Sequence, residues 1–109
     1  MIGYFLPVPR VVAWARAHLE QVDVETFAEH VGVSVRTLHR RCRDTLATTP
    51  ATLLDKLRVE HARTLLATSD LAVKALAADC GFGNPARMKR AFERELGMGP
   101  REYRVLHGT

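Results

Sequence analysis

The chain has 109 residues and two cysteines, 47% of its residues are hydrophobic, and its formal net charge is +4. This length suits one compact domain, or two very small ones that must pack together to bury enough surface. No apolar run approaches the roughly 20 residues that cross a bilayer, and the apolar start of the chain is too short and too interrupted by proline for a secretory signal, so we expect a cytoplasmic protein without a membrane partner.

Three helices are predicted in the first half of the chain, because apolar residues recur there at intervals of three and four. They are expected at residues 9–21, 24–31 and 34–46. Asp23 and Ser34 are the expected N-caps, since a short side-chain oxygen can accept from the N–H groups of the first helical turn. Gly32 is expected to form the turn before the third helix, because glycine takes the left-handed conformation without strain.

A long fourth helix is predicted to open at Thr49 and Pro50 and to end near residue 67. Its apolar stripe consists of Leu53, Leu54, Leu57, Ala62, Leu65 and Leu66, and the residues expected to face solvent are Lys56, Arg58, Glu60 and Arg63. A helix of this length spans about 27 Å. When the offsets of the two basic helices from its ends are added, the spacing between those helices approaches one DNA turn of about 34 Å.

The last part of the chain is predicted to hold helices at residues 71–80, 84–96 and 101–106. Gly81 is the expected turn residue and Asn84 the expected cap. Pro85 suits the first helical position, where its missing N–H would have no partner. Because no segment shows sustained period-two alternation, we expect no sheet.

The segments 27–46 and 76–96 form an internal repeat. The matching pairs are Ala28 and Ala77, Gly32 and Gly81, Leu38 and Met88, Arg40 and Arg90, Leu46 and Leu96, and Pro50 and Pro100. The offset grows from 49 to 50 at the turn, so the second turn is one residue longer. The predicted fold is therefore all-α, with about seven helices forming two helix-turn-helix subdomains joined by a long linker helix. We assign residues 1–109 to one domain, with 9–48 as the first unit, 49–68 as the linker helix and 69–106 as the second unit.

Positive charge is concentrated on two helices. Residues 34–43 carry a net charge of +4 and residues 85–94 a net charge of +3, so the rest of the chain sums to −3. Such focused charge is typical of a nucleic-acid binder, whereas an arginine-rich face taken alone is more often a solvated surface. The alternative from another class is a helical protein-interaction module that docks an acidic partner such as an RNA polymerase subunit.

Arginine can donate two hydrogen bonds to guanine in the major groove, and other cations meet phosphates. The candidates for base contacts are Arg36, His39 and Arg40 in the first basic helix and Arg87 and Arg90 in the second. The candidates for phosphate contacts are Arg41, Arg43, Lys89 and Arg94, together with the caps Ser34 and Asn84.

Other chemistries find no support in the sequence. The five histidines and two cysteines show no zinc-site spacing, so we expect no metal and no cofactor. Gly81, Phe82 and Gly83 lack the lysine and preceding strand of a phosphate-binding loop. No acid–base pair or nucleophile arrangement indicates an enzyme. The aromatic residues expected to pack in the core or between helices are Trp14, Phe27, Phe82 and Phe92.

A further set of residues matches the sequence pattern of a known protein family. Its members are Arg58, Ala62, Leu65 and Leu66 on the long helix, Ala77, Gly81 and Phe82 at the second turn, and Gly97, Pro100, Tyr103 and Arg104 at the close. With them, residues 24–104, about three quarters of the chain, resemble the DNA-binding domain of AraC/XylS-type bacterial transcription regulators. Trp14 and the segment 36–38 resemble the subgroup with an upstream amidotransferase-like sensing domain, so we expect this chain to be the DNA-binding half of a longer regulator.

The resemblance implies a monomeric domain that contacts two successive major-groove segments of double-stranded DNA, with any dimer formed through the missing domain. It also implies that Pro85 and Ala86 face the bases, although they offer few hydrogen bonds. The chain departs from the family at Cys42 and Met88, where an aromatic residue is usual, and at Ala47, where glycine is usual.

Overall fold

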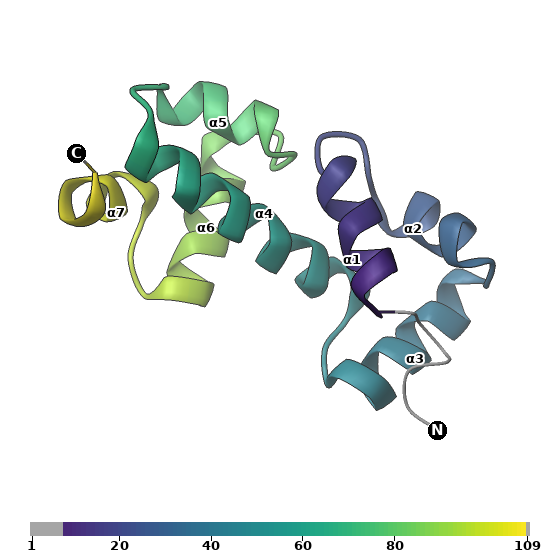
Figure 1. Ribbon diagram of the computed structural model, residues 1–109. Helices are drawn as coiled ribbons and strands as arrows, with labels where there is room; N and C mark the ends of the chain where they lie inside the picture. Colours follow the sequence, from purple (N-terminus) through teal and green to yellow (C-terminus); the bar gives the residue numbers. More distant parts are fainter. Residues whose placement is uncertain (1–7, 109) are drawn as a thin grey trace. The chain divides into compact units, whose positions relative to one another are not determined.

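A computed structural model describes residues 8–108, and within that range all regular structure is helical (Figure 1). The helices are α1 (Val8–Ala17), α2 (Val24–Val31), α3 (Val35–Leu46), α4 (Pro50–Thr68), α5 (Val73–Asp79), α6 (Pro85–Leu96) and α7 (Pro100–His107). None of these helices is long and apolar enough to cross a membrane. The predicted all-α class with seven helices is confirmed for the described residues.

The chain divides into two compact units, and the division falls within α4, between Leu54 and Asp55. The first unit contains α1, α2, α3 and the first residues of α4. The second contains the rest of α4 with α5, α6 and α7. Each unit holds one helix-turn-helix pair, α2 with α3 and α5 with α6, as the internal repeat predicts.

The core of the first unit forms where α2 and α3 pack together. Phe27 of α2 and Leu38 and Cys42 of α3 are fully buried. The indole of Trp14 in α1 stacks on the imidazole of His30, with ring centroids 4.0 Å apart. The ring centroid of Phe27 lies 6.5 Å from that of the Trp14 indole. The predicted packing roles of the tryptophan and the phenylalanine are confirmed.

Helix α1 ends at Ala17, earlier than the predicted end at residue 21. The Nδ1 atom of His18 donates to the carbonyl oxygen of Trp14 at 2.7 Å, and the backbone N–H of His18 donates instead to Ala15 at 3.1 Å. Because the side chain takes the carbonyl that would continue the α-helical ladder, the backbone tightens into a turn. Hydrophobic spacing gives no sign of this competition.

The core of the second unit contains residues of α4, α5 and α6. Its buried members are Val59, Ala62, Leu66, Leu76, Ala77, Cys80, Phe82, Met88, Ala91 and Phe92. The ring of Phe92 lies 6.4 Å from that of Phe82 and meets that of Tyr103 edge-on at 6.2 Å. Edge-to-face pairs of this kind add about 0.5–1.5 kcal/mol beyond the burial of their area. The buried faces of α4, α5 and α6 therefore build this core together.

Arg104 fastens the closing helix α7 to the end of α4. Its Nε atom donates to the carbonyl oxygen of Leu66 at 3.2 Å, and its Nη2 atom donates to that of Ser69 at 3.4 Å. Carbonyl groups at the end of a helix have no backbone partner further along it, so the guanidinium satisfies groups that would otherwise need water. Arg104 and its neighbour Tyr103 thus have structural roles within the second unit.

The prediction that Arg58 faces solvent is wrong. The residue is 7% exposed, and its Nη1 atom lies 3.4 Å from Oδ1 of Asp55, three residues earlier in α4. A buried cation needs a nearby opposite charge, and the helical spacing supplies one.

The predicted start of the fifth helix at residue 71 is also wrong, since α5 begins at Val73. The hydroxyl oxygen of Ser69 accepts from the N–H of Leu71 at 3.4 Å and donates to the carbonyl of Leu65 at 2.7 Å. A serine that bonds to its own neighbourhood in this way competes with helix formation, so Leu71 stays in the connection.

Candidate nucleic-acid interface

The helices α3 and α6 each follow a turn with a left-handed glycine. Gly32 has φ +85° and Gly81 has φ +92°. The carbonyl oxygens of the matching alanines, Ala28 and Ala77, each accept a backbone N–H from the turn at 3.1 Å. Gly83, with φ +90°, accommodates the longer second turn. The repeat seen in the sequence therefore extends to the geometry of the turns.

Both helices are capped by the predicted side chains. The hydroxyl oxygen of Ser34 accepts from the N–H of Thr37 at 3.1 Å, and Oδ1 of Asn84 accepts from the N–H of Arg87 at 2.9 Å. Replacing such a cap by alanine costs about 1 kcal/mol. The two caps fix where the basic helices begin, and their contacts with phosphate stay predictions.

The exposed face of α3 forms a hollow in the surface. Its lining residues are Arg36, Thr37, His39, Arg40 and Arg43. Leu38 and Cys42 on the opposite side are fully buried, which orients the helix and turns this face outward. The structure thus brings together the base-contact candidates of α3 and one of its phosphate candidates. Thr37 was not a predicted site residue, although its position between Arg36 and Arg40 in the sequence could have indicated that it lines the same face.

Arg41 lies apart from that hollow. It is partly buried at the flank of α3. The other basic candidates of this helix are exposed, namely Arg36, His39, Arg40 and Arg43. A flanking position is what its predicted phosphate contact requires, and that contact stays a prediction.

The predicted site residues of α6 are all exposed. They are Pro85, Ala86, Arg87, Lys89, Arg90 and Arg94. Met88 and Phe92 on the other side are fully buried, so the predicted site residues face away from the core of the second unit. A Cβ placed on Gly83 would lie 3.9 Å from Nη1 of Arg87, so this guanidinium lies beside the turn.

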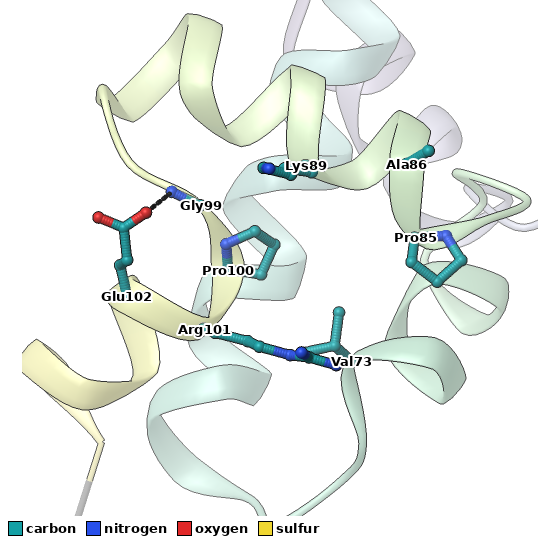
Figure 2. A pocket seen from close by; sticks show the side chains of 8 residues that line it. All are labelled: Val73, Pro85, Ala86, Lys89, Gly99, Pro100, Arg101 and Glu102. Atoms are coloured by element: carbon teal, nitrogen blue, oxygen red, sulfur yellow. Dashed lines mark hydrogen bonds between the residues drawn. The ribbon is translucent and has the colours of Figure 1, made fainter.

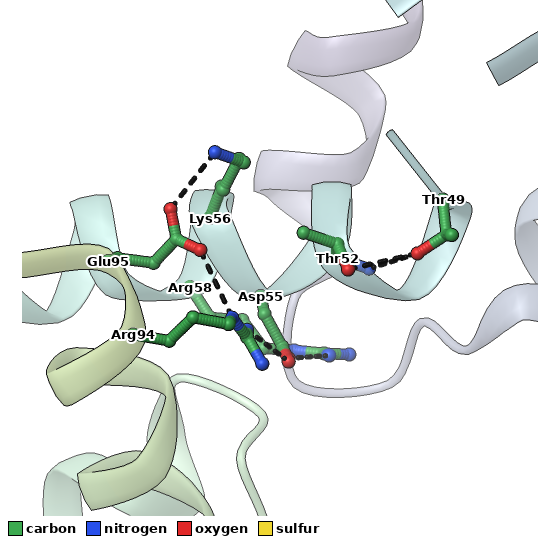
Figure 3. Close-up of polar contacts among 7 residues, drawn as sticks. All are labelled: Thr49, Thr52, Asp55, Lys56, Arg58, Arg94 and Glu95. Atoms are coloured by element: carbon green, nitrogen blue, oxygen red, sulfur yellow. Dashed lines mark hydrogen bonds and ion pairs between the residues drawn. The ribbon is translucent and has the colours of Figure 1, made fainter. Parts of the chain in front are cut away.

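An ion-pair cluster joins α6 to α4 within the second unit (Figure 3). Arg94 donates from Nη2 to Oδ2 of Asp55 at 3.0 Å and from Nε to Oε2 of Glu95 at 3.2 Å. The ammonium of Lys56 lies 3.0 Å from Oε1 of Glu95. No local pattern predicts a pairing between residues 39 positions apart. Arg94, predicted to contact phosphate, is therefore also a structural ion-pair partner, with 48% of its side chain exposed.

Two members of the cluster have shifted pKa values. Burial acts to raise the pKa of Glu95, but the hydrogen bonds from Lys56 and Arg94 outweigh it and hold that pKa below its ordinary value of 4.5. The hydrogen bond to Asp55 raises the pKa of Arg94. In the core, burial and the nearby charge of Asp79 raise the pKa of Cys80 to about 11, so this thiol is neutral.

A second hollow lies where α6 meets the start of α7 (Figure 2). Its lining residues are Val73, Pro85, Ala86, Lys89, Gly99, Pro100, Arg101 and Glu102. Arg101 was not a predicted site residue. Its place in the same hollow as Lys89 arises from the packing of α7 on α6, which no local pattern encodes.

In the part of the chain that the structure describes, no group of three His, Cys, Asp or Glu side chains could hold a metal ion.

Sequence comparison identifies relatives among transcription regulators. A family model described as a helix-turn-helix domain matches residues 27–105. The HTH-type transcriptional activator RhaS of Escherichia fergusonii is 39% identical over 95 residues, which are 86% of this chain and 34% of that protein. RhaS of Enterobacter sp. strain 638 is 38% identical over 96 residues, 87% of this chain and 34% of that protein. The chain spans about a third of the length of these curated relatives.

Solved structures extend the likeness to nearly the whole chain. The DNA-binding domain of AdpA, a global transcriptional factor crystallised in complex with a target DNA, has a TM-score of 0.81 and 42% identity, covering 92% of this chain and 91% of that one. A transcriptional regulator of the AraC-type DNA-binding class from Chromobacterium violaceum has a TM-score of 0.80 and 27% identity, covering 91% and 89%. The chain therefore belongs to the helix-turn-helix domain family, as a DNA-binding domain of the AraC type.

Proposed function

We propose that the chain binds double-stranded DNA sequence-specifically, as the DNA-binding domain of a transcription regulator. The observation that carries this proposal is the presence of two capped helices, α3 and α6, each with an exposed arginine-bearing face after a helix-turn-helix turn. A helix of this kind fits the major groove, where each base pair presents a distinct set of donors and acceptors. The domain of AdpA, 42% identical, was solved on its target DNA, which supports the same role here.

The two faces divide into base contacts and phosphate contacts. We assign the bases to Arg36, His39 and Arg40 of α3 and to Pro85, Ala86, Arg87 and Arg90 of α6. We assign the phosphates to Ser34, Arg41, Arg43, Asn84, Lys89 and Arg94. Phosphate contacts position the protein on the duplex, and base contacts specify the sequence.

Two recognition helices in one chain allow a monomer to contact two successive major-groove segments. In this assignment residues 9–48 and 69–106 are the two DNA-contacting units and residues 49–68 connect them. The matched relatives are about three times longer, so we assign a sensing domain and any dimerisation to a longer regulator. Such a regulator acts in the bacterial cytoplasm, where it meets the chromosome, and its DNA-binding domain needs no cofactor and no catalytic group.

The alternative, a module that docks an acidic protein such as a polymerase subunit, draws no support from the matched relatives, which are transcription regulators. A selection from a randomised duplex pool, followed by anisotropy titrations at several salt concentrations, distinguishes the two. DNA binding predicts an enriched sequence and an affinity that falls steeply as salt rises. Failure to enrich any sequence, with an affinity indifferent to salt, would exclude it.

A further inference from the structure

The leading end of α6 presents an apolar surface where a recognition helix usually presents polar groups. Pro85 and Ala86 are the first two residues of the helix, and both are exposed. Neither side chain carries a hydrogen-bond donor or acceptor. These two side chains therefore cannot distinguish bases by the hydrogen bonds that arginine makes, unlike Arg87, which follows them in the helix.

Ala86 is nevertheless well placed to meet a base. It stands four residues before Arg90, so the two side chains are neighbours on one face of the helix. Met88 and Phe92 are buried on the opposite side, which turns this face outward. When α6 enters the major groove with Arg90 toward the base edges, the methyl group of Ala86 faces the same groove.

The hollow beside this face has a cationic edge. Ala86 and Pro85 line it together with Lys89 and with Arg101 of α7 (Figure 2). Glu102, the acidic member of the lining, accepts from the backbone N–H of Gly99 at 3.3 Å and so completes the cap of α7. Two cations beside an apolar surface suit a DNA strand whose phosphate meets the charges and whose base presents an apolar group.

The apolar group that a base presents in the major groove is the 5-methyl group of thymine, which alanine can contact. We propose that Ala86, supported by Pro85, selects a thymine in the DNA segment that α6 contacts, by burying that methyl group. This rests on the proposed function and makes the two units chemically different. The arginines of α3 select guanine, and the start of α6 selects thymine.

Replacing thymine by uracil removes the 5-methyl group and leaves the base pair intact. On the best site from the selection, each thymine is replaced singly by uracil and the Kd of the full chain is measured by anisotropy. Burial of one methyl-sized group corresponds to about a fourfold change in Kd. The expected result is that one thymine, in the half contacted by α6, shows this loss.

Ala86→Gly removes the methyl group on the protein side. We expect its Kd to be the same within twofold on thymine and on uracil at that position. Ala78→Gly is the matched control, since Ala78 is exposed on α5 of the same unit and outside the hollow, and it should keep the fourfold difference. If Ala86→Gly fails to fold, as judged by circular dichroism, Ala86→Ser avoids glycine and places a polar hydroxyl against the thymine methyl group, so it should still reduce the difference.

Four outcomes are decisive. A uracil effect that disappears in Ala86→Gly and persists in Ala78→Gly supports the proposal. A uracil effect that is equal in the wild type and in Ala86→Gly overturns it, because another group then contacts the methyl. Absence of any uracil effect, with a sequence enriched and guanine preferences intact, also overturns the proposal but leaves the proposed function standing. Failure to enrich any sequence contradicts the proposed function itself.

Discussion

Asp55 of α4 accepts a hydrogen bond from Arg94 of α6 at 3.0 Å, so the far end of α6 is fastened to α4 (Figure 3). The same carboxylate accepts from Arg58 at 3.4 Å. The two arginines differ in environment, since 48% of the Arg94 side chain is exposed and only 8% of the Arg58 side chain. A buried cation depends more on its counter-charge than an exposed one, so Asp55 matters chiefly through Arg58.

We therefore expect Asp55→Asn to lower the free energy of unfolding by about 1–3 kcal/mol, because it weakens the charge partner of a buried guanidinium. Arg94→Gln breaks only the exposed pairs and should cost less than about 1 kcal/mol. Chemical denaturation of the two variants and the wild type measures both values. Equal losses in the two variants would show that burial of Arg58 does not set the energy of the cluster.

The stability of the second unit should depend on pH through Glu95. Its folded pKa lies below 4.5, because the hydrogen bonds from Lys56 and Arg94 outweigh its burial. The carboxylate therefore stabilises the folded state fully above its unfolded pKa, and this contribution is lost as the pH falls through the lower, folded pKa. We expect Glu95→Gln to lose less stability than the wild type as the pH is lowered from 6. Thermal melts of both proteins at each pH measure the loss. The exposed Glu93→Gln on the same helix is the control and should follow the wild-type curve.

Local signals in the sequence predicted much of this fold. The caps Asp23, Ser34 and Asn84 and the turn glycines Gly32 and Gly81 all have the predicted roles, because each depends on a few neighbouring residues. The buried faces of α3 and α6 followed from periodicity for the same reason. These features sufficed to place the exposed candidates for DNA contact.

What could not be predicted depends on contacts between distant residues. Arg58 has the spacing of a solvent-facing residue, yet it is buried, because tertiary packing covers it and Asp55 supplies an opposite charge. Arg101 lines the same hollow as Lys89 because α7 packs on α6. The early end of α1 depends on one side chain, that of His18, competing for a backbone carbonyl.

The matching positions Ala47 and Gly97 offer a test of backbone strain. Both follow a basic helix in the left-handed conformation, with φ +54° at Ala47 and φ +75° at Gly97. Alanine pays a steric cost there that glycine avoids, partly offset by the greater freedom of glycine in the unfolded chain. We expect Ala47→Gly to stabilise the protein by about 0.5–1 kcal/mol.

The reverse substitution, Gly97→Ala, should destabilise it by about 1–2 kcal/mol. A Cβ at Gly97 would meet nothing within 4 Å, so any loss there comes from the backbone and not from a clash. Thermal or chemical denaturation of the pair gives both signs. A loss of stability in Ala47→Gly would mean that the methyl group of Ala47 contributes more than its strained backbone costs.

We propose that α3 distinguishes bases through Arg40, while Arg43 on the same exposed face contacts phosphate. The most direct test is an anisotropy titration of Arg40→Ala and Arg43→Ala against the best selected duplex and against a random duplex. We expect Arg40→Ala to lose about 1–3 kcal/mol on the selected duplex and little on the random one, and Arg43→Ala to weaken both alike with a smaller salt dependence. Equal losses on the two duplexes for Arg40→Ala would contradict the assignment.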